Sequence, residues 1–123
     1  MFDHLSVGVR DLSAARAFYD AFFAPLGYVR LAGTKANELA YGPPGEGHFW
    51  LYAGDGGERL ASPGTHVAFR APTQDAVHSA ADAARARGAT FTREPGPHPD
   101  IAPDYYGAIL LGPDGHKLEV VVE

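Results

Sequence analysis

The stretch FDHLSVGVRDL, residues 2–12, decides the fold because its pattern returns later in the chain. Read with the two-residue period of a β-strand, Leu5, Val7 and Val9 share one face, and His4 begins the other face. The stretch GTHVAFRAP, residues 64–72, shows the same alternation, with His66 in the place of His4. The sequence therefore predicts two strands of one kind, each with a histidine at its start.

The elements that follow these two strands also match. A helix with apolar residues at helical spacing is predicted over 10–27 and another over 73–88, each ended by glycine. Strands are predicted at residues 3–9, 28–32, 37–42 and 48–53, and again at residues 65–71, 89–93, 105–112 and 116–122. The order β-α-β-β-β thus occurs twice, as expected for a structural repeat of about 60 residues.

This repeat predicts an α+β fold of two βαβββ modules that form a cupped, mostly antiparallel sheet. Short turns between consecutive strands favour antiparallel pairing, and one helix per module covers one face of its sheet. We expect residues 1–123 to form one domain, with module 1 at residues 1–55 and module 2 at residues 64–123. The faces without helices would then line the cup.

The composition of the chain argues against several classes of protein. The chain has 123 residues, 46% of them apolar, with a net charge of −5. The acidic balance argues against nucleic acid as a partner, and no apolar run approaches the roughly 20 residues that a membrane span needs. The absence of cysteine excludes disulfides and thiolate chemistry and fits a reducing compartment. We therefore expect a cytoplasmic protein that binds neither nucleic acid nor membrane.

Three residues on the predicted cup face could bind a metal. His4 and His66 begin matching strands, and Glu119 interrupts the apolar strand KLEVVV at residues 117–122. A carboxylate between apolar neighbours is costly to bury unless it is paired or binds a cation. Two imidazoles and one carboxylate are typical ligands of a first-row divalent ion such as Fe, Mn, Ni, Co or Zn.

The quoted segments, together with YYGAILLGPDGHKLEVVVE at residues 105–123, resemble the vicinal oxygen chelate superfamily of glyoxalases, bleomycin resistance proteins and dioxygenases. The resemblance covers nearly the whole chain and implies paired βαβββ modules. It also implies metal ligands at the first strand of each module and at the last strand. Those positions are His4, His66 and Glu119, which the strand alternation had also selected.

Glyoxalase-like members of that superfamily add a fourth ligand, usually Glu, on the last strand of the first module. Here the corresponding strand reads GHFWLYAG, residues 47–54, and a gap-free alignment places His48 there, with Trp50 as the competing residue. Neither is the expected Glu. This departure favours a three-ligand site of the dioxygenase or fosfomycin-transferase type, with His48 as a further candidate ligand or a residue that faces the substrate.

Two functions follow as hypotheses. The first is a divalent-metal enzyme, a lyase, dioxygenase or thiol transferase, that acts on a small oxygenated substrate, with Glu119 as a candidate base. The second is a metal-free binding protein of the bleomycin-sequestering type. Either function would use a substrate pocket lined by His48, Trp50, Tyr52, His98, Tyr105 and Tyr106, although the aromatic residues could equally be core. Loops 54–64 and 94–104 are candidate specificity elements. Open sheet edges predict a homodimer.

Overall fold

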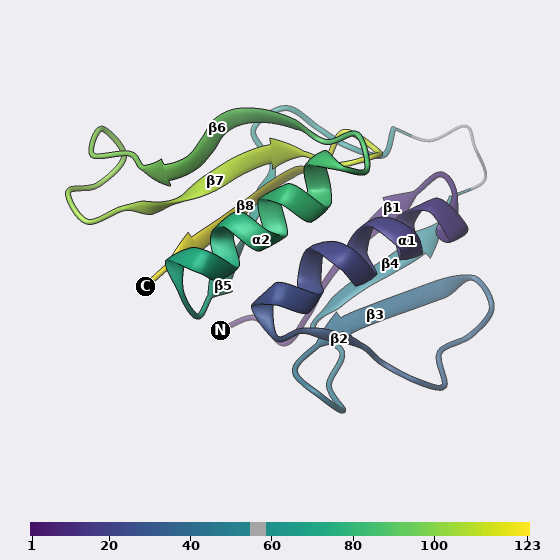
Figure 1. Ribbon diagram of the computed structural model, residues 1–123. Coiled ribbons are helices and arrows are strands. Elements are labelled where there is room, and N and C mark those ends of the chain that lie inside the picture. The colour runs from purple at the N-terminus through teal and green to yellow at the C-terminus, as the bar shows by residue number, and fades with distance from the viewer. Residues whose placement is uncertain (55–58) are drawn as a thin grey trace.

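The computed structural model describes residues 1–54 and 59–123, and both modules have the predicted order (Figure 1). Residues 55–58, which include the end of module 1 and part of the loop 54–64, lie outside the described residues. Module 1 contains β1 (Leu5–Val9), α1 (Leu12–Phe23), the 3₁₀ helix η1 (Ala24–Leu26), β2 (Val29–Arg30), β3 (Glu38–Gly42) and β4 (Phe49–Ala53). Module 2 contains β5 (His66–Ala71), α2 (Gln74–Arg85), β6 (Thr90–Pro97), β7 (Tyr106–Leu111) and β8 (Lys117–Val122).

Each module forms one four-stranded sheet, and the two sheets have the same strand order. Sheet A is β1-β4-β3-β2 and sheet B is β5-β8-β7-β6. The first and last strands of each module pair in parallel, and the other neighbours pair antiparallel. The α+β fold of two mostly antiparallel βαβββ modules is therefore confirmed.

The two helices begin at side-chain caps and pack against each other. Asp11 accepts hydrogen bonds from the backbone of α1, and Thr73 accepts one from the backbone of α2. The helices lie side by side in front of the two sheets (Figure 1). Their apolar faces enter one core cluster with the strands, in which Phe23 of α1 meets Phe69 of β5 at 4.8 Å between ring centroids. Helix packing therefore joins the modules.

The Pro-rich segment 94–104 is a loop only in part. The structure continues β6 through Pro97, whereas the sequence predicted an end at residue 93. Proline lacks the N–H that a central strand must donate, but β6 is the outer strand of sheet B and borders β7 on one side only. The register shifts between Phe91 and Gly96 are the irregularities that allow this strand to contain prolines.

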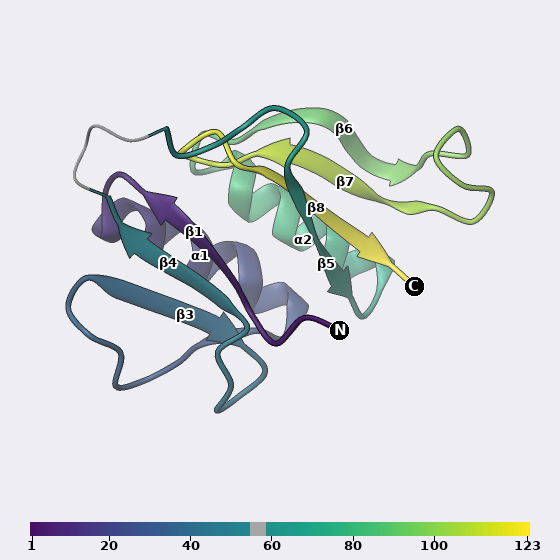
Figure 2. The same cartoon turned by 180° about the vertical axis from the view of Figure 1, so that it is seen from behind.

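The helix-free faces of both sheets are seen together in Figure 2. β1 and β5 run in opposite directions across the middle of this view, so the starts of the two strands lie at opposite ends. The packing of α1 on α2 joins the modules in this arrangement. It determines where His4 and His66 lie.

Within residues 1–54 and 59–123, the structure has no helix of the length and apolar character that crossing a membrane requires.

Candidate functional site

The best-formed cluster of functional side chains lies on the helix-free face of sheet B. His66 begins β5, and Glu119 lies in the middle of the neighbouring parallel strand β8. The imidazole Nε2 of His66 is 3.4 Å from Oε2 of Glu119, and the Glu119 side chain is only 13% exposed. Its strand neighbours Leu118 and Val120 are fully buried on the helix side, so alternation points Glu119 to the other face.

Tyr105 completes this cluster. Its hydroxyl donates a hydrogen bond to Oε1 of Glu119 at 2.8 Å. Burial and the adjacent carboxylate raise the pKa of Tyr105 well above its usual value, so the phenol keeps its proton at neutral pH. Sequence reasoning named Tyr105 as a pocket residue but missed its contact with Glu119. The two residues are 14 positions apart, and no local motif marks such a pair.

His98 supports Tyr105 from the loop that follows β6. Its ring centroid lies 5.8 Å from that of Tyr105, and its Nε2 is 2.7 Å from the backbone carbonyl of Glu94. The backbone N–H of His98 also donates to the carbonyl of Tyr105. The structure thus brings together four of the predicted site residues: His66, Glu119, Tyr105 and His98.

His4 lies away from this cluster, at the start of β1. Its Nδ1 is 2.5 Å from Oδ1 of Asp3, and this hydrogen bond, with the charge of the imidazole, lowers the pKa of Asp3. His48 precedes β4, and its Nε2 is 2.7 Å from Oε2 of Glu46. Within residues 1–54 and 59–123, no three His, Asp or Glu side chains are grouped closely enough to hold a metal ion. One chain groups His66 with Glu119 and leaves His4 apart from them, so a metal site of all three residues stays a prediction.

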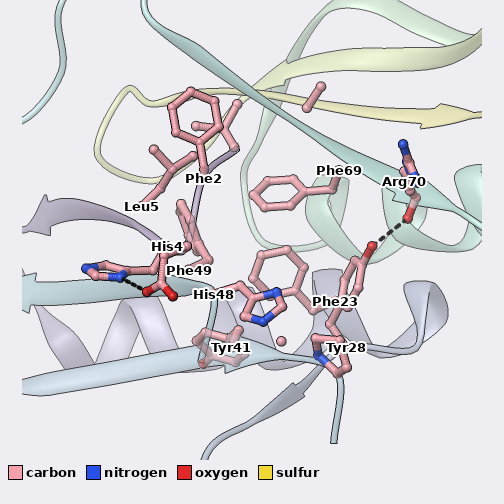
Figure 3. A pocket seen from close by; sticks show the side chains of 15 residues that line it. Phe2, His4, Leu5, Phe23, Tyr28, Tyr41, His48, Phe49, Phe69 and Arg70 are labelled. Carbon is pink, nitrogen blue, oxygen red and sulfur yellow. Dashed lines mark hydrogen bonds and ion pairs between the residues drawn. The ribbon is translucent and has the colours of Figure 1, made fainter. Parts of the chain in front are cut away.

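The two histidines of the predicted trio border different pockets. His4 and His48 border a pocket of about 260 Å³ at the seam between the modules. Figure 3 shows its wall of aromatic rings, among them Phe23, Phe49 and Phe69. His66 borders a second pocket, of about 280 Å³, together with Lys117 and residues 59–62. One chain therefore presents the imidazoles to separate spaces.

The strand register identifies the counterpart of Glu119 in module 1. Glu119 pairs with Ala68, two residues after His66, and Trp50 pairs with Ser6, two residues after His4. Trp50 is thus the equivalent residue, and the gap-free alignment that placed His48 there is off by two positions. An indole cannot serve as a metal ligand, so module 1 has an aromatic ring at the register position that Glu119 occupies in module 2.

Trp50 and Tyr52 form a stacked pair on the helix-free face of sheet A. Their ring centroids are 6.3 Å apart with planes 15° from parallel, and Tyr52 is 38% exposed. The indole N–H of Trp50 donates to the carbonyl of Gly47, which fixes the ring on the sheet. This pair presents a flat aromatic surface outside the core.

The structure does not place Tyr106 in the pocket that the sequence predicted for it. Its hydroxyl is 2.7 Å from Nε2 of His78, a residue of α2. The ring therefore points to the helix side of sheet B, opposite to Tyr105. Alternation along a strand puts neighbouring residues on opposite faces, so Tyr105 and Tyr106 could not both line the helix-free face.

Comparisons with known proteins identify the family of this chain and structures that resemble it. The model of the glyoxalase/bleomycin resistance protein/dioxygenase superfamily matches residues 1–120. A glyoxalase/bleomycin resistance protein from Albidiferax ferrireducens has a similar structure, with a TM-score of 0.85, 29% identity, and coverage of 100% of this chain and 99% of that one. No curated protein matches the chain.

More distant structures share the fold. The fosfomycin resistance protein FosX from Mesorhizobium loti has a TM-score of 0.72 at 18% identity, over 100% of this chain and 92% of that one. A FosX variant from Listeria monocytogenes, solved with Mn(II) and a dihydroxypropylphosphonic acid, has a TM-score of 0.71 at 17% identity, over 98% and 88%. With the family model covering nearly its full length, the chain belongs to the glyoxalase/bleomycin resistance protein/dioxygenase superfamily.

Proposed function

We propose that this protein is a divalent-metal-dependent enzyme that acts on a small oxygenated substrate, in a lyase, dioxygenase or thiol-transfer reaction. The observation that carries the proposal is the contact between His66 and Glu119. A mostly buried carboxylate and the imidazole nitrogen that it faces supply two of the three ligands of a two-histidine, one-carboxylate site, and the burial of the carboxylate is offset when a cation binds. The donor set therefore fits Fe, Mn, Ni, Co or Zn.

The third ligand in this proposal is His4 of a second copy in a homodimer. In one chain His4 and His66 border different pockets, and both sheets leave their helix-free faces open. If sheet A of one copy faced sheet B of another, His4 would approach His66 and Glu119. The repeat supports this arrangement, because His4 occupies in module 1 the place that His66 occupies in module 2.

The residues of the chain then have separate roles. A bound divalent cation supplies Lewis-acid activation of substrate oxygens. His66 and Glu119 hold that cation, and Glu119 acts as general base only when its oxygen has left the metal. Trp50, in the place of a fourth ligand, leaves one more position open and gives the substrate an aromatic wall. Because position 50 has no carboxylate, the proposed reaction does not pass a proton between two glutamates.

Elemental analysis tests this proposal. The protein is purified without added metal beside the variants His4→Ala, His66→Ala and Glu119→Ala. We expect about one equivalent of a first-row divalent metal per wild-type chain and a loss in each variant. Wild-type protein that carries no metal and takes up none of the five candidate ions would contradict the metalloenzyme.

A mixing experiment tests the second copy. We co-express His4→Ala and His66→Ala chains with different tags and isolate the mixed dimer. If ligands come from two copies, one of its two sites combines an intact His4 with an intact His66 and Glu119, so the dimer binds about half of the wild-type metal. If one chain supplied all ligands, every site in the mixed dimer would be defective. Each variant alone is the matched control and should bind almost none.

A second candidate function rests on the aromatic pair of sheet A. A metal-free binding protein would hold a planar ligand against Trp50 and Tyr52, whose rings are already stacked and accessible. The acidic net charge suits a cationic ligand. Trp50 is the only tryptophan, so its fluorescence reports binding directly. Quenching by a planar cation in protein that binds no metal would favour this function over the enzyme.

A further inference from the structure

The two oxygens of the Glu119 carboxylate have different partners. Oε1 accepts the hydrogen bond of the Tyr105 hydroxyl at 2.8 Å, whereas Oε2 faces Nε2 of His66 at 3.4 Å. The Tyr105 bond is short and well within hydrogen-bond range, and it ends on a largely buried carboxylate. The carboxylate is therefore held in one rotation, with one oxygen occupied and the other directed at the imidazole.

A glycine two residues after Tyr105 makes this contact possible. Tyr105 directly precedes β7, residues 107 and 109 share one face of that strand, and Ile109 is paired with Glu119 in the register. Tyr105 therefore reaches Glu119 only by lying across position 107. A Cβ at Gly107 would come within 2.8 Å of the Tyr105 hydroxyl oxygen and within 2.4 Å of the carbonyl oxygen of Val120. Gly107 leaves the space that the phenol fills.

The Tyr105 ring has a further neighbour in His98. The imidazole of His98 lies against it at 5.8 Å between centroids, and His98 is itself tied to the backbone of Glu94. Glu119, Gly107 and His98 together thus hold the phenol in position. A side chain held in this way can orient a ligand without binding the metal itself.

From these contacts we infer that Tyr105 is a positioning residue that occupies Oε1 of Glu119 and reserves Oε2 for the metal. The inference rests on the proposed function and deepens it. Glu119 would then offer a bound divalent cation one oxygen instead of two, because the other oxygen stays hydrogen-bonded to Tyr105.

The test compares two tyrosines that are neighbours in the sequence. Tyr105→Phe removes only the hydroxyl that contacts Glu119, and Tyr106→Phe removes a hydroxyl that contacts His78 on the opposite side of the sheet. The probe is Mn²⁺ alone, titrated into the full-length protein, with free and bound ion distinguished by electron paramagnetic resonance. Glu119→Ala marks the loss of the site. Urea midpoints confirm that each variant is folded.

We expect Tyr105→Phe to bind Mn²⁺ about tenfold more weakly than the wild type, because loss of an outer hydrogen bond to a ligand typically has an effect of this size. Tyr106→Phe should bind as the wild type does. The spectrum of the bound ion should also change in Tyr105→Phe, since the carboxylate is no longer held by one oxygen. A general loss of stability would reduce the amount bound and leave that spectrum unchanged.

The outcomes separate the inference from the function on which it rests. Affinity within twofold of the wild type, or an unchanged spectrum of the bound ion, in folded Tyr105→Phe would overturn the role of Tyr105 while the metal site stands. Failure of the wild type to bind Mn²⁺, or equal binding by Glu119→Ala, would instead refute the metal site at Glu119.

Discussion

Two buried tyrosines in module 1 allow a matched test of hydrogen-bond energetics in the core. The rings of Tyr19 and Tyr41 are 6.0 Å apart, and both residues are almost fully buried. The hydroxyl of Tyr41 donates to Oδ1 of Asp20 at 2.8 Å. The hydroxyl of Tyr19 has no hydrogen-bond partner within residues 1–54 and 59–123. Replacing each tyrosine with phenylalanine removes a hydroxyl oxygen, which is hydrogen-bonded to Asp20 in Tyr41 and has no partner within the described residues in Tyr19.

The expected changes have opposite signs. A hydrogen bond to a charged group stabilises a protein by about 1.5–3 kcal/mol. Asp20 is 40% exposed and keeps its contact with Arg30 after the bond is lost, so we expect Tyr41→Phe to lower the free energy of unfolding by about 1 kcal/mol. An unpartnered buried hydroxyl costs about 1–3 kcal/mol, so Tyr19→Phe should raise the free energy of unfolding by about 1 kcal/mol.

Urea unfolding measures the difference. With a slope of about 2 kcal/mol per molar urea, typical of small proteins, the midpoints of the two variants should differ by about 1 M. The fluorescence of Trp50 follows the transition, and all samples are held at one protein concentration because the stability of the proposed homodimer would depend on it. A loss of stability in Tyr19→Phe as large as that in Tyr41→Phe would show that the Tyr19 hydroxyl is satisfied, and the reasoning would fail.

We also expect Tyr19→Phe to change how the stability of the protein depends on alkaline pH. Burial, with the nearby charge of Asp114, raises the pKa of Tyr19 above its usual value near 10. A raised folded-state pKa contributes stability that is complete below pH 10 and is lost as the pH rises further, by at most about 1.4 kcal/mol per pH unit. Tyr19→Phe removes this contribution, so its stability should fall less steeply between pH 10 and 11. An identical slope would contradict the burial of an un-ionised phenol.

Three further outcomes are expected. Thr73→Ala should lower the free energy of unfolding by about 1 kcal/mol, measured by urea unfolding, because α2 loses its N-cap hydrogen bond. Phe23→Ala should lower it by about 3–5 kcal/mol while circular dichroism and Trp50 fluorescence still report one coincident transition, as expected if residues 1–123 form a single domain. Arg93→Ala should return the pKa of Asp100 toward its usual value, followed by carboxyl NMR titration, because the guanidinium hydrogen bond that lowers it is lost.

Periodicity in the sequence predicted the order of elements because the fold depends on local patterns. Alternation in residues 2–12 and 64–72 located both first strands, and the helical spacing after them located both helices. The same alternation placed Glu119 on the helix-free face of sheet B. Such patterns depend only on neighbours along the chain, so a single sequence is enough to read them.

Features that depend on pairing between distant segments could not be predicted in this way. Deciding whether His48 or Trp50 is the counterpart of Glu119 required the register of β1 against β4. Alternation along one strand does not fix that register to a single residue. The contact of Tyr105 with Glu119 depends on Gly107 and on the hairpin of β7 and β8. The extension of β6 through Pro97 depends on its being an outer strand.

Because His4 lies apart from His66, the two modules of the repeat have different roles in the proposed site. In the proposed metal site the two modules contribute differently, since module 2 would provide His66 and Glu119 whereas module 1 would provide His4 and has Trp50 in the place of the glutamate. The starts of β1 and β5 lie at opposite ends of the seam, so the two proposed half-sites border different pockets of one chain. Two copies related by a twofold axis would complete two identical sites, each with three protein ligands and one aromatic wall. On this reasoning, a variant that keeps its fold but cannot dimerise should lose metal at both sites together.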